Sequence, residues 1–193
     1  ARRAHLHVTA VTDPGLLGKS NEDRFAVSAH RLSHNDPTPS LLAIVADGVG
    51  GHRAGEVAAE MAVETISRLV AESDAAQPAQ ILSQALAHAS RLIFDQSHRD
   101  LAQVGMGTTA VCAWIIGDRL YAAAAGDSRL YLLRDGALQR LTIDHTWVQE
   151  ALDHGSLSPA GARDHPNAHV IRRYLGAKHP LRADLRLRLH ASE

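Results

Sequence analysis

SLLAIVADGVGGH, residues 40–52, is the stretch that decides the fold of this chain. Its first part, up to Ala46, is an almost unbroken apolar run, which predicts a β-strand buried on both faces. The run ends at Asp47, so the strand carries a carboxylate to the edge of a sheet, where Gly48 lets the main chain approach a ligand closely. A carboxylate oxygen beside an accessible carbonyl suits a hard divalent cation.

The sequence of this turn argues against two other functions. An Asp-Gly pair can simply close a hairpin, but three glycines between Asp47 and Gly51, directly before a helix, exceed what a hairpin requires. A nucleotide-binding loop fails on three counts. The glycines lack the dinucleotide spacing, no Lys-Ser or Lys-Thr pair follows, and a carboxylate stands where phosphate would sit.

Two amphipathic helices are predicted after the turn. From Gly55 to about Ala71, apolar residues recur at helical spacing, with acidic and basic residues on the other side. A second helix follows Pro78, a residue favoured at helix starts, and its apolar stripe continues to Ile93. We expect the two helices to pack side by side.

The rest of the chain favours short strands. Turn pairs at Gly117-Asp118, Gly126-Asp127 and Asp135-Gly136 are interpreted as hairpin turns. The expected strands are 6–12, 24–29, 40–46, 108–116, 119–125, 128–133, 137–141 and 181–190, and short helices are expected at 146–153 and 159–164. Strands, two long helices and hairpins predict an α+β fold, with residues 1–193 as a single domain.

Composition limits the class of partner. The chain has 193 residues, 45% of them hydrophobic, and its 20 Lys and Arg nearly balance 21 Asp and Glu. We therefore expect neither nucleic acid nor a membrane surface as a partner. No apolar run approaches the roughly 20 residues of a membrane span, and the start of the sequence lacks a secretory pattern, so a cytoplasmic protein is the default expectation.

Cys112 is the single cysteine, which excludes an internal disulfide and a thiolate metal cluster. A cysteine-dependent phosphatase would need an Arg after a five-residue phosphate loop. Here Arg119 follows too late, beyond a strand-like apolar segment. We therefore expect Cys112 to be buried in a sheet and inert.

Two further acidic stretches could contribute to a site. Asn21-Glu22-Asp23 places adjacent carboxylates on an extended chain, where they point to opposite sides. The alternative is a solvated acidic loop. Gly126-Asp127-Ser128-Arg129 lies between two apolar segments, and its alternative is a plain turn in which Arg129 pairs with Asp127.

Taken in order, these stretches resemble the serial motifs of the PPM family, the type 2C protein phosphatases, and especially its bacterial branch. The motifs are Asn21-Glu22-Asp23, Asp47-Gly48-Val49-Gly50-Gly51-His52, Gly107-Thr108-Thr109, Gly126-Asp127-Ser128-Arg129, Leu141-Thr142-Ile143-Asp144-His145 and His165-Pro166. The resemblance runs from about Val8 to Gly176. It implies an antiparallel β-sandwich flanked by helices on both faces, in four layers, with two Mn²⁺ or Mg²⁺ ions at one end.

The resemblance also implies roles for individual residues. Asp47 would bridge the two metals, the Gly48 carbonyl would bind one of them, and Asp23 would complete that site with Glu22 acting through water. Asp127 resembles the residue that holds a third ion. Asp47 and Asp23 would thus be the catalytic residues. Two nearby cations lower the pKa of a bridging water towards about 7, and the resulting hydroxide would attack phosphorus in phosphoserine or phosphothreonine.

The sequence departs from the family pattern in two places. Gly18 stands where members usually carry the Arg that grips the substrate phosphate, so Lys19 is predicted to supply that charge, with weaker affinity. The family's later Asp-Gly and Asp-Asn motifs do not occur before Glu193. We expect a C-terminally incomplete domain. A natural relative that lost a metal site is the alternative.

The expected partners follow from the resemblance. The enzyme would act on phosphorylated proteins as a monomer, with a Ser/Thr kinase as a further partner. The alternative function is a non-catalytic pseudophosphatase module that binds a phosphoprotein or regulates it. Residues 145–168, rich in His, Asp, Gly and Pro, are interpreted as a mobile flap that helps to choose the substrate.

Overall fold

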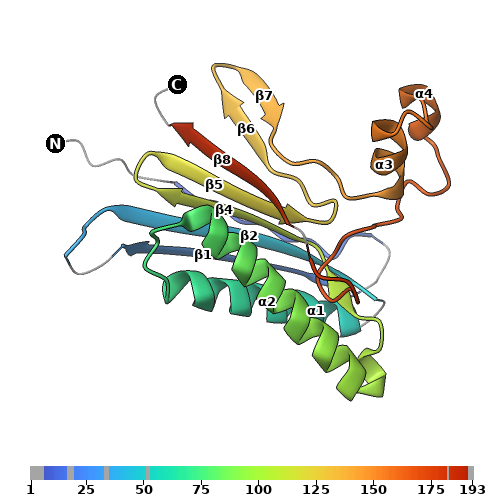
Figure 1. Ribbon diagram of the computed structural model, residues 1–193, viewed down its shortest axis with the longest axis horizontal. Coiled ribbons are helices and arrows are strands. Elements are labelled where there is room, and N and C mark those ends of the chain that lie inside the picture. The colour runs from blue at the N-terminus through green and yellow to red at the C-terminus, as the bar shows by residue number, and fades with distance from the viewer. Residues whose placement is uncertain (1–6, 17–19, 33–34, 51–52, 182, 191–193) are drawn as a thin grey trace.

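The computed structural model describes residues 7–16, 20–32, 35–50, 53–181 and 183–190 (Figure 1). Its main sheet is antiparallel and has the strand order β1 (Asp23–Arg31), β2 (Pro39–Val49), β4 (Ala110–Ile116), β5 (Arg119–Ala125) and β8 (Asp184–His190). The short β3 (Gly107–Thr108) pairs with the end of β2. A separate two-stranded sheet contains β6 (Tyr131–Arg134) and β7 (Ala137–Arg140).

Strand β2 lies between β1 and β4 and carries the decisive stretch through the sheet. Its inward residues Leu42, Ile44 and Ala46 are almost fully buried. Trp114 of β4 is opposite Leu42 in the register, and its indole N–H donates to the Ser40 hydroxyl at 2.8 Å. The core therefore fixes the register of β2, and with it the position of the turn at its end.

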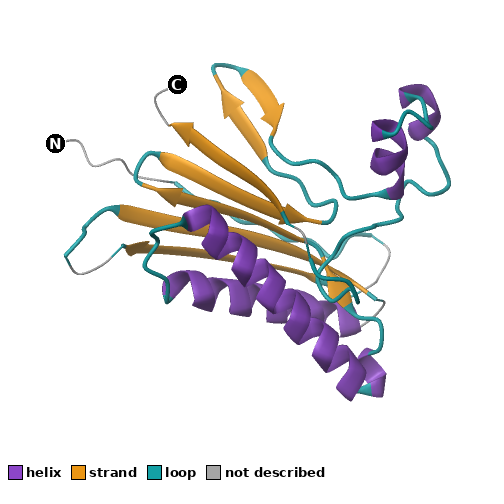
Figure 2. Ribbon diagram, in the orientation of Figure 1, coloured by secondary structure: helices purple, strands orange, loops and turns teal. Residues whose placement is uncertain are grey.

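The two long helices form one layer on the main sheet (Figure 2). α1 (Arg53–Ala71) and α2 (Pro78–Arg99) pack against each other and against the sheet, as predicted. The side chains buried between these layers include Ala58, Ala62, Ile66, Leu82, Leu86, Ile93, Cys112, Ala123 and Ala125. Alanines on the face of β5 that meets α2 leave room for the helix to approach closely.

The sheet face opposite the helices is only partly covered by the described residues. Val45 is 47% exposed, and Phe25 and Val27 of β1 are each 42% exposed. Burial of β2 on both faces was therefore a wrong prediction for Val45. The apolar run places apolar side chains on both faces of β2. Within the described ranges, helices cover only one of these faces.

Two of the three predicted hairpin turns are confirmed. Gly117, with φ of 60°, turns β4 into β5, and Asp135-Gly136 turns β6 into β7. The expected hairpin at Gly126-Asp127 is wrong, because β5 pairs with β4 and β8 whereas β6 pairs with β7. This turn instead leads the chain from one sheet to the other. The expected strand at 6–12 is also absent over the described residues 7–12.

The smaller elements stand apart from the main sheet. α3 (Trp147–Asp153) and α4 (Pro159–Ala162) project to the right in Figure 1, near the predicted short helices. A short 3-10 helix, η1 (Leu101–Gln103), follows α2.

The predicted α+β class, with antiparallel sheets and flanking helices, is confirmed. No helix in the described ranges is long and apolar enough to span a bilayer.

Candidate metal centre

Antiparallel pairing of β1 with β2 brings two of the predicted site residues together. Asp23, the first residue of β1, is directly opposite Asp47 near the end of β2. Residues paired in this way point to the same face of a sheet, with Cβ atoms about 5 Å apart. Asn21 helps to position this start of β1, because its side-chain oxygen accepts the amide of Asp23 at 3.0 Å.

The charges around Asp47 are all negative. Burial raises the pKa of Asp47 to about 6, together with the charges of Asp23 and Asp127, a hydrogen bond with Asp23, and the charge of Glu22. The Asp47 residue is nonetheless exposed to solvent, so repulsion from the neighbouring carboxylates is a stronger physical cause than burial. The carboxylates of the three predicted acidic stretches therefore act on one another at one place.

Glycines let the start of α1 lie against this cluster. A Cβ added to Gly48 would be 2.3 Å from the carbonyl oxygen of Gly55, and one added to Gly55 would be 2.0 Å from the Glu22 carboxylate. The Gly48 amide also donates to the Glu22 carbonyl at 3.3 Å. Gly48, Gly55 and Glu22 therefore pack with no space for a further carbon atom.

The main chain of Asp47 is held by two threonines at the start of the next sheet segment. Its carbonyl accepts the Thr108 hydroxyl and the Thr109 amide, each at 2.9 Å. Its amide donates to the Thr109 hydroxyl oxygen at 3.0 Å. Both polar groups of the Asp47 backbone are thus satisfied, which fixes the direction of the carboxylate.

Thr109 also reaches the Asp127 turn. Its hydroxyl lies 2.6 Å from that of Ser128, and a Cβ added to Gly126 would be 2.5 Å from the Thr109 methyl group. Gly126 has φ of 106°, a conformation that favours glycine. Thr109 therefore joins the two acidic turns.

His145 supports the same turn from the other side and is only 1% exposed. Its Nδ1 accepts the amide of Gly126 at 3.1 Å, and its own amide donates to the Gly126 carbonyl at 2.9 Å. In the neutral ring the proton is then on Nε2. Nε2 lies 3.1 Å from the carboxylate of Asp184, at ion-pair distance but without the alignment of a hydrogen bond.

The interpretation of Gly126–Arg129 as a turn closed by an Arg129–Asp127 pair is wrong. The Arg129 guanidinium binds both carboxylate oxygens of Asp144, with a shortest distance of 2.6 Å. In the parts of the chain that the structure describes, no basic side chain forms an ion pair with Glu22, Asp23, Asp47 or Asp127. The neighbouring basic residues are engaged elsewhere, since Arg24 pairs with Glu56.

A divalent cation fits this chemistry. Clustered, solvent-accessible carboxylates without a basic partner, next to a main chain opened by glycine, offer hard oxygen ligands and need a compensating charge. The set is partial: among the described residues, no three His, Cys, Asp or Glu side chains converge as ready metal ligands. The described residues thus offer part of a set of oxygen ligands.

Two other predicted residues have different outcomes. Lys19, predicted to bind the substrate phosphate, and Gly18 beside it lie outside the described residues. Cys112 is buried in β4 as predicted, and burial raises the pKa of its thiol to about 12. A thiolate nucleophile at this position is excluded.

Sequence reasoning missed the residues that support the cluster. Thr109 and His145 belonged to recognised motifs, but no role was inferred for either. Gly55 was interpreted only as the start of a helix. The pair Thr108-Thr109 and the residue His145 are only weak sequence signals of a supporting role, because the groups that they contact are distant in the sequence.

Comparison with known proteins decides the family. The sequence model of the protein phosphatase 2C family matches residues 16–151. The chain belongs to this family. The phosphatase is 36% identical over 183 residues to the serine/threonine phosphatase stp of Listeria monocytogenes, covering 93% of this chain and 70% of that protein.

Solved structures agree with this assignment. The serine/threonine phosphatase of S. agalactiae matches with a TM-score of 0.82 and 31% identity, over 93% of this chain and 73% of that one. The catalytic domain of PstP, solved in complex with two manganese ions, matches with a TM-score of 0.70 and 34% identity, over 91% and 69%. The resemblance to type 2C phosphatases is confirmed, and the chain is shorter than these relatives.

Proposed function

We propose that this phosphatase hydrolyses phosphoserine and phosphothreonine in proteins, using Mn²⁺ or Mg²⁺. The observation that carries the proposal is the carboxylate cluster formed where Asp23 of β1 meets Asp47 of β2. Membership of the type 2C family supports the reaction, and the manganese-containing PstP domain supports the metal. Both supports are independent of the carboxylate geometry.

The proposed metal ligands are the residues around this cluster. Asp47 and Asp23 would hold the ions directly, the Gly48 carbonyl would be a further ligand, and Glu22 would act through water. Asp127 would hold an additional ion, consistent with its effect on the pKa of Asp47. The remaining ligands would come from outside the described residues, which agrees with the partial set found here.

The chain's own residues would position and polarise the reactants. When bound, divalent cations supply Lewis-acid activation of water and neutralise charge on the phosphoryl oxygens. Thr108 and Thr109 hold the Asp47 backbone, so the carboxylate keeps its direction while it binds a cation. A covalent phosphoenzyme on Cys112 is not part of the proposal, because that thiol is buried and its pKa is raised.

Substrate recognition is proposed for two further regions. Lys19 would contribute a positive charge to the substrate phosphate. Residues 145–168 would form the flap that selects the protein substrate, and in this segment Trp147 stacks on His165 with ring centres 4.7 Å apart. This contact gives α3 and the loop after α4 a common packing unit. A Ser/Thr kinase as partner, a monomeric state and a cytoplasmic location remain predictions.

Replacing Asp47 by Asn tests the proposal. With Mn²⁺ present, we expect Asp47→Asn to lower kcat/KM for a phosphothreonine peptide by more than about 100-fold, because transition-state charge loses its stabilising cation. Asp135→Asn is the matched control, since Asp135 lies at the β6–β7 turn with φ of 50°, which Asn tolerates. It should leave the rate unchanged.

Equal rates for wild type and Asp47→Asn would contradict the metal-binding role. A wild-type protein that binds the phosphopeptide but releases no phosphate at any Mn²⁺ concentration would instead support the non-catalytic module. The partial ligand set is the one observation that favours this second function. Measuring peptide binding and phosphate release in the same samples distinguishes the two.

A further inference from the structure

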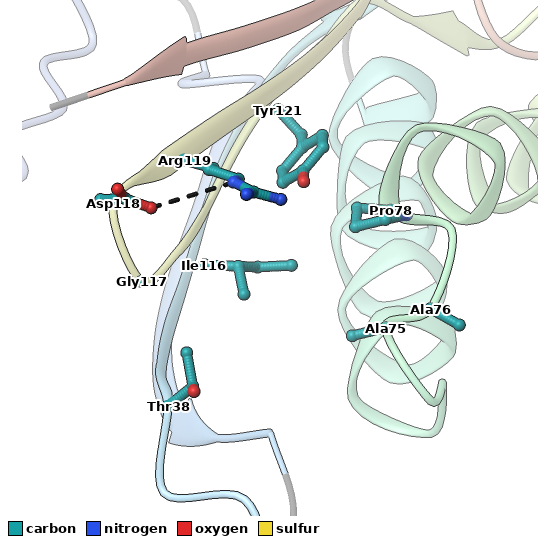
Figure 3. Close-up of a pocket in the computed structure, with 9 residues that line it drawn as sticks. All are labelled: Thr38, Ala75, Ala76, Pro78, Ile116, Gly117, Asp118, Arg119 and Tyr121. Atoms are coloured by element: carbon teal, nitrogen blue, oxygen red, sulfur yellow. Dashed lines mark ion pairs between the residues drawn. The ribbon is translucent and has the colours of Figure 1, made fainter. Parts of the chain in front are cut away.

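The first residue of β8 lies at the same end of the main sheet as the Asp127 turn. β5 begins after the Gly117 hairpin, beside a hollow lined by the start of α2 (Figure 3), and ends at Ala125. β8 runs antiparallel to β5, with Asp184 opposite Ala124. The sheet therefore holds Asp184 close to the turn, although the two are distant in the sequence.

The carboxylate of Asp184 lies against the buried ring of His145. Its Oδ2 is 3.1 Å from Nε2 of His145, a nitrogen that makes no hydrogen bond within the described chain. The His145 side chain is 1% exposed, whereas that of Asp184 is 35% exposed. Because water hardly reaches Nε2, the carboxylate is the group that compensates for its lost hydration.

Both ends of the His145 ring select the same neutral tautomer. The Gly126 amide donates to Nδ1 at 3.1 Å, so Nδ1 carries the lone pair. The proton is then on Nε2, where it faces Asp184. The other tautomer would oppose two donors at Nδ1 and would place the lone pair of Nε2 against a carboxylate. Asp184 and Gly126 therefore hold the ring in one state.

The main chain of His145 joins this ring to the Asp127 turn. Its amide donates to the Gly126 carbonyl at 2.9 Å, and its carbonyl accepts the Arg172 amide at 2.7 Å. His145 thus binds both polar backbone groups of Gly126, the residue directly before Asp127. A rotated ring would release the Gly126 amide, and the direction of the Asp127 carboxylate would no longer be fixed.

Arg173 approaches the same carboxylate from the solvent side. Its Nη1 lies 3.5 Å from Oδ1 of Asp184, and its side chain is 41% exposed. Exposed ion pairs at such distances contribute little. The contact with the buried His145 ring is therefore the one in which removal of Asp184 leaves a polar group without compensation.

We propose that Asp184 is a positioning residue: it fixes the tautomer and orientation of His145, and through His145 the direction of the Asp127 carboxylate. Groups that orient the residues around a metal ion change its affinity although they do not touch it. The effect on an ion at Asp127 rests on the proposed function, whereas the effect on the His145 ring does not.

The first measurement needs neither metal nor substrate. In the metal-free protein at about pH 8, where imidazole is ordinarily neutral, the ¹⁵N signals of the His145 ring report its tautomer. We expect the Nε2–H form alone in wild type. Asp184→Ala should show a measurable share of the Nδ1–H form, with a shifted Gly126 amide signal. Asp184→Asn keeps the shape and an acceptor oxygen, so it should retain the wild-type tautomer.

The second measurement follows the ion, with Mg²⁺ as a diamagnetic probe. Mg²⁺ is titrated while the ¹H–¹⁵N signals of Asp127 and Asp47 are recorded. We expect Asp184→Ala to raise the Mg²⁺ concentration for a half-maximal shift at Asp127 about three- to tenfold. The change at Asp47 should be smaller, because Thr108 and Thr109 hold its main chain. Asp184→Asn should restore the response at Asp127.

Arg173→Gln is the matched control, because it removes the other contact of Asp184 and leaves the contact with His145. It should behave as wild type in both measurements. A single His145 tautomer in Asp184→Ala, or equal losses in Arg173→Gln and Asp184→Ala, would overturn the proposal. A protein in which neither Asp47 nor Asp127 responds to Mg²⁺ would contradict the proposed function instead, and the ring signals would still decide whether Asp184 positions His145.

Discussion

The Asp47 turn and the Asp127 turn both place a carboxylate at the end of a core strand, but they are held by different means. Asp47 lies within the main sheet, paired with Asp23. The start of α1 packs directly against this turn, because Gly48 and Gly55 have no side chains to separate them. Asp127 is the second residue after the end of β5, where the chain leaves the sheet. Side chains of Thr109 and His145 support its neighbours Ser128 and Gly126.

This difference separates two kinds of support. The Asp47 turn is part of the fold, because moving it requires moving β2, β3 or α1. The Asp127 turn depends on a few polar contacts that single substitutions can remove. We therefore expect changes near Asp47 to affect stability and catalysis together, and changes near Asp127 to affect mainly the binding of an additional ion.

The largest effect is expected for Gly48→Ala. A methyl group at this position would lie 2.3 Å from the backbone oxygen of Gly55. Because the clash is with backbone, a change of side-chain rotamer cannot relieve it. We expect a loss of about 3 kcal/mol in the free energy of unfolding, or roughly 10 °C in Tm. Thermal unfolding followed by circular dichroism measures it, and activity should fall in parallel.

Gly161→Ala is the control for Gly48→Ala. Its nearest contact would be the flexible end of Leu157 at 3.2 Å, and the residue lies within α4. Its Tm should stay close to that of wild type. A Gly48→Ala protein as stable as Gly161→Ala would show that α1 can shift away from the turn, and the distinction between the two turns would be lost.

His145→Ala tests the second turn. The change leaves a buried cavity and removes the acceptor of the Gly126 amide, so we expect a loss of about 2 kcal/mol. We also expect the Mn²⁺ concentration for half-maximal activity to rise about tenfold, as for other residues that support a metal ligand. Denaturant unfolding and Mn²⁺ titration of activity measure the two effects.

His145→Asn sharpens this result, because its side-chain oxygen can replace the acceptor at Nδ1 but cannot reach Asp184. Recovery of the Mn²⁺ requirement by Asn would assign the effect to the bond with Gly126. If Asn and Ala behave alike, the contact between His145 and Asp184 supports the turn instead.

The parts of the fold that sequence predicted are those with local patterns. The apolar run before Asp47 and the helical spacing after Gly55 each report one element, and β2 and α1 were both confirmed. The pairing of strands is not local. Gly126-Asp127 has the composition of a hairpin turn, yet the strands on its two sides belong to different sheets.

The candidate site divides in the same way. Asp23, Asp47 and Asp127 were predicted from motifs, and the structure brings their charges together. The contacts that hold them were not predictable, since Thr109 lies 62 residues from Asp47 and His145 lies 19 residues from Gly126. Arg129 illustrates the limit: its nearest acidic residue in sequence is Asp127, but its partner is Asp144. The choice depends on tertiary geometry.

Thr109→Val gives the smallest and most specific effect, because Thr109 is the residue shared by both turns. Valine keeps the shape of the side chain but removes the acceptor for the Asp47 amide and the partner of Ser128. We expect a loss of about 1–2 kcal/mol by denaturant unfolding. Ser128→Ala removes only the contact on the Asp127 side and should cost less. If both variants lose the same stability, the bond to Asp47 contributes nothing measurable.

Combining Thr109→Val with His145→Ala tests whether the two residues are coupled. A loss of unfolding free energy smaller than the sum of the two single losses would show that both residues support one unit. Additive losses would show that the two turns are held independently.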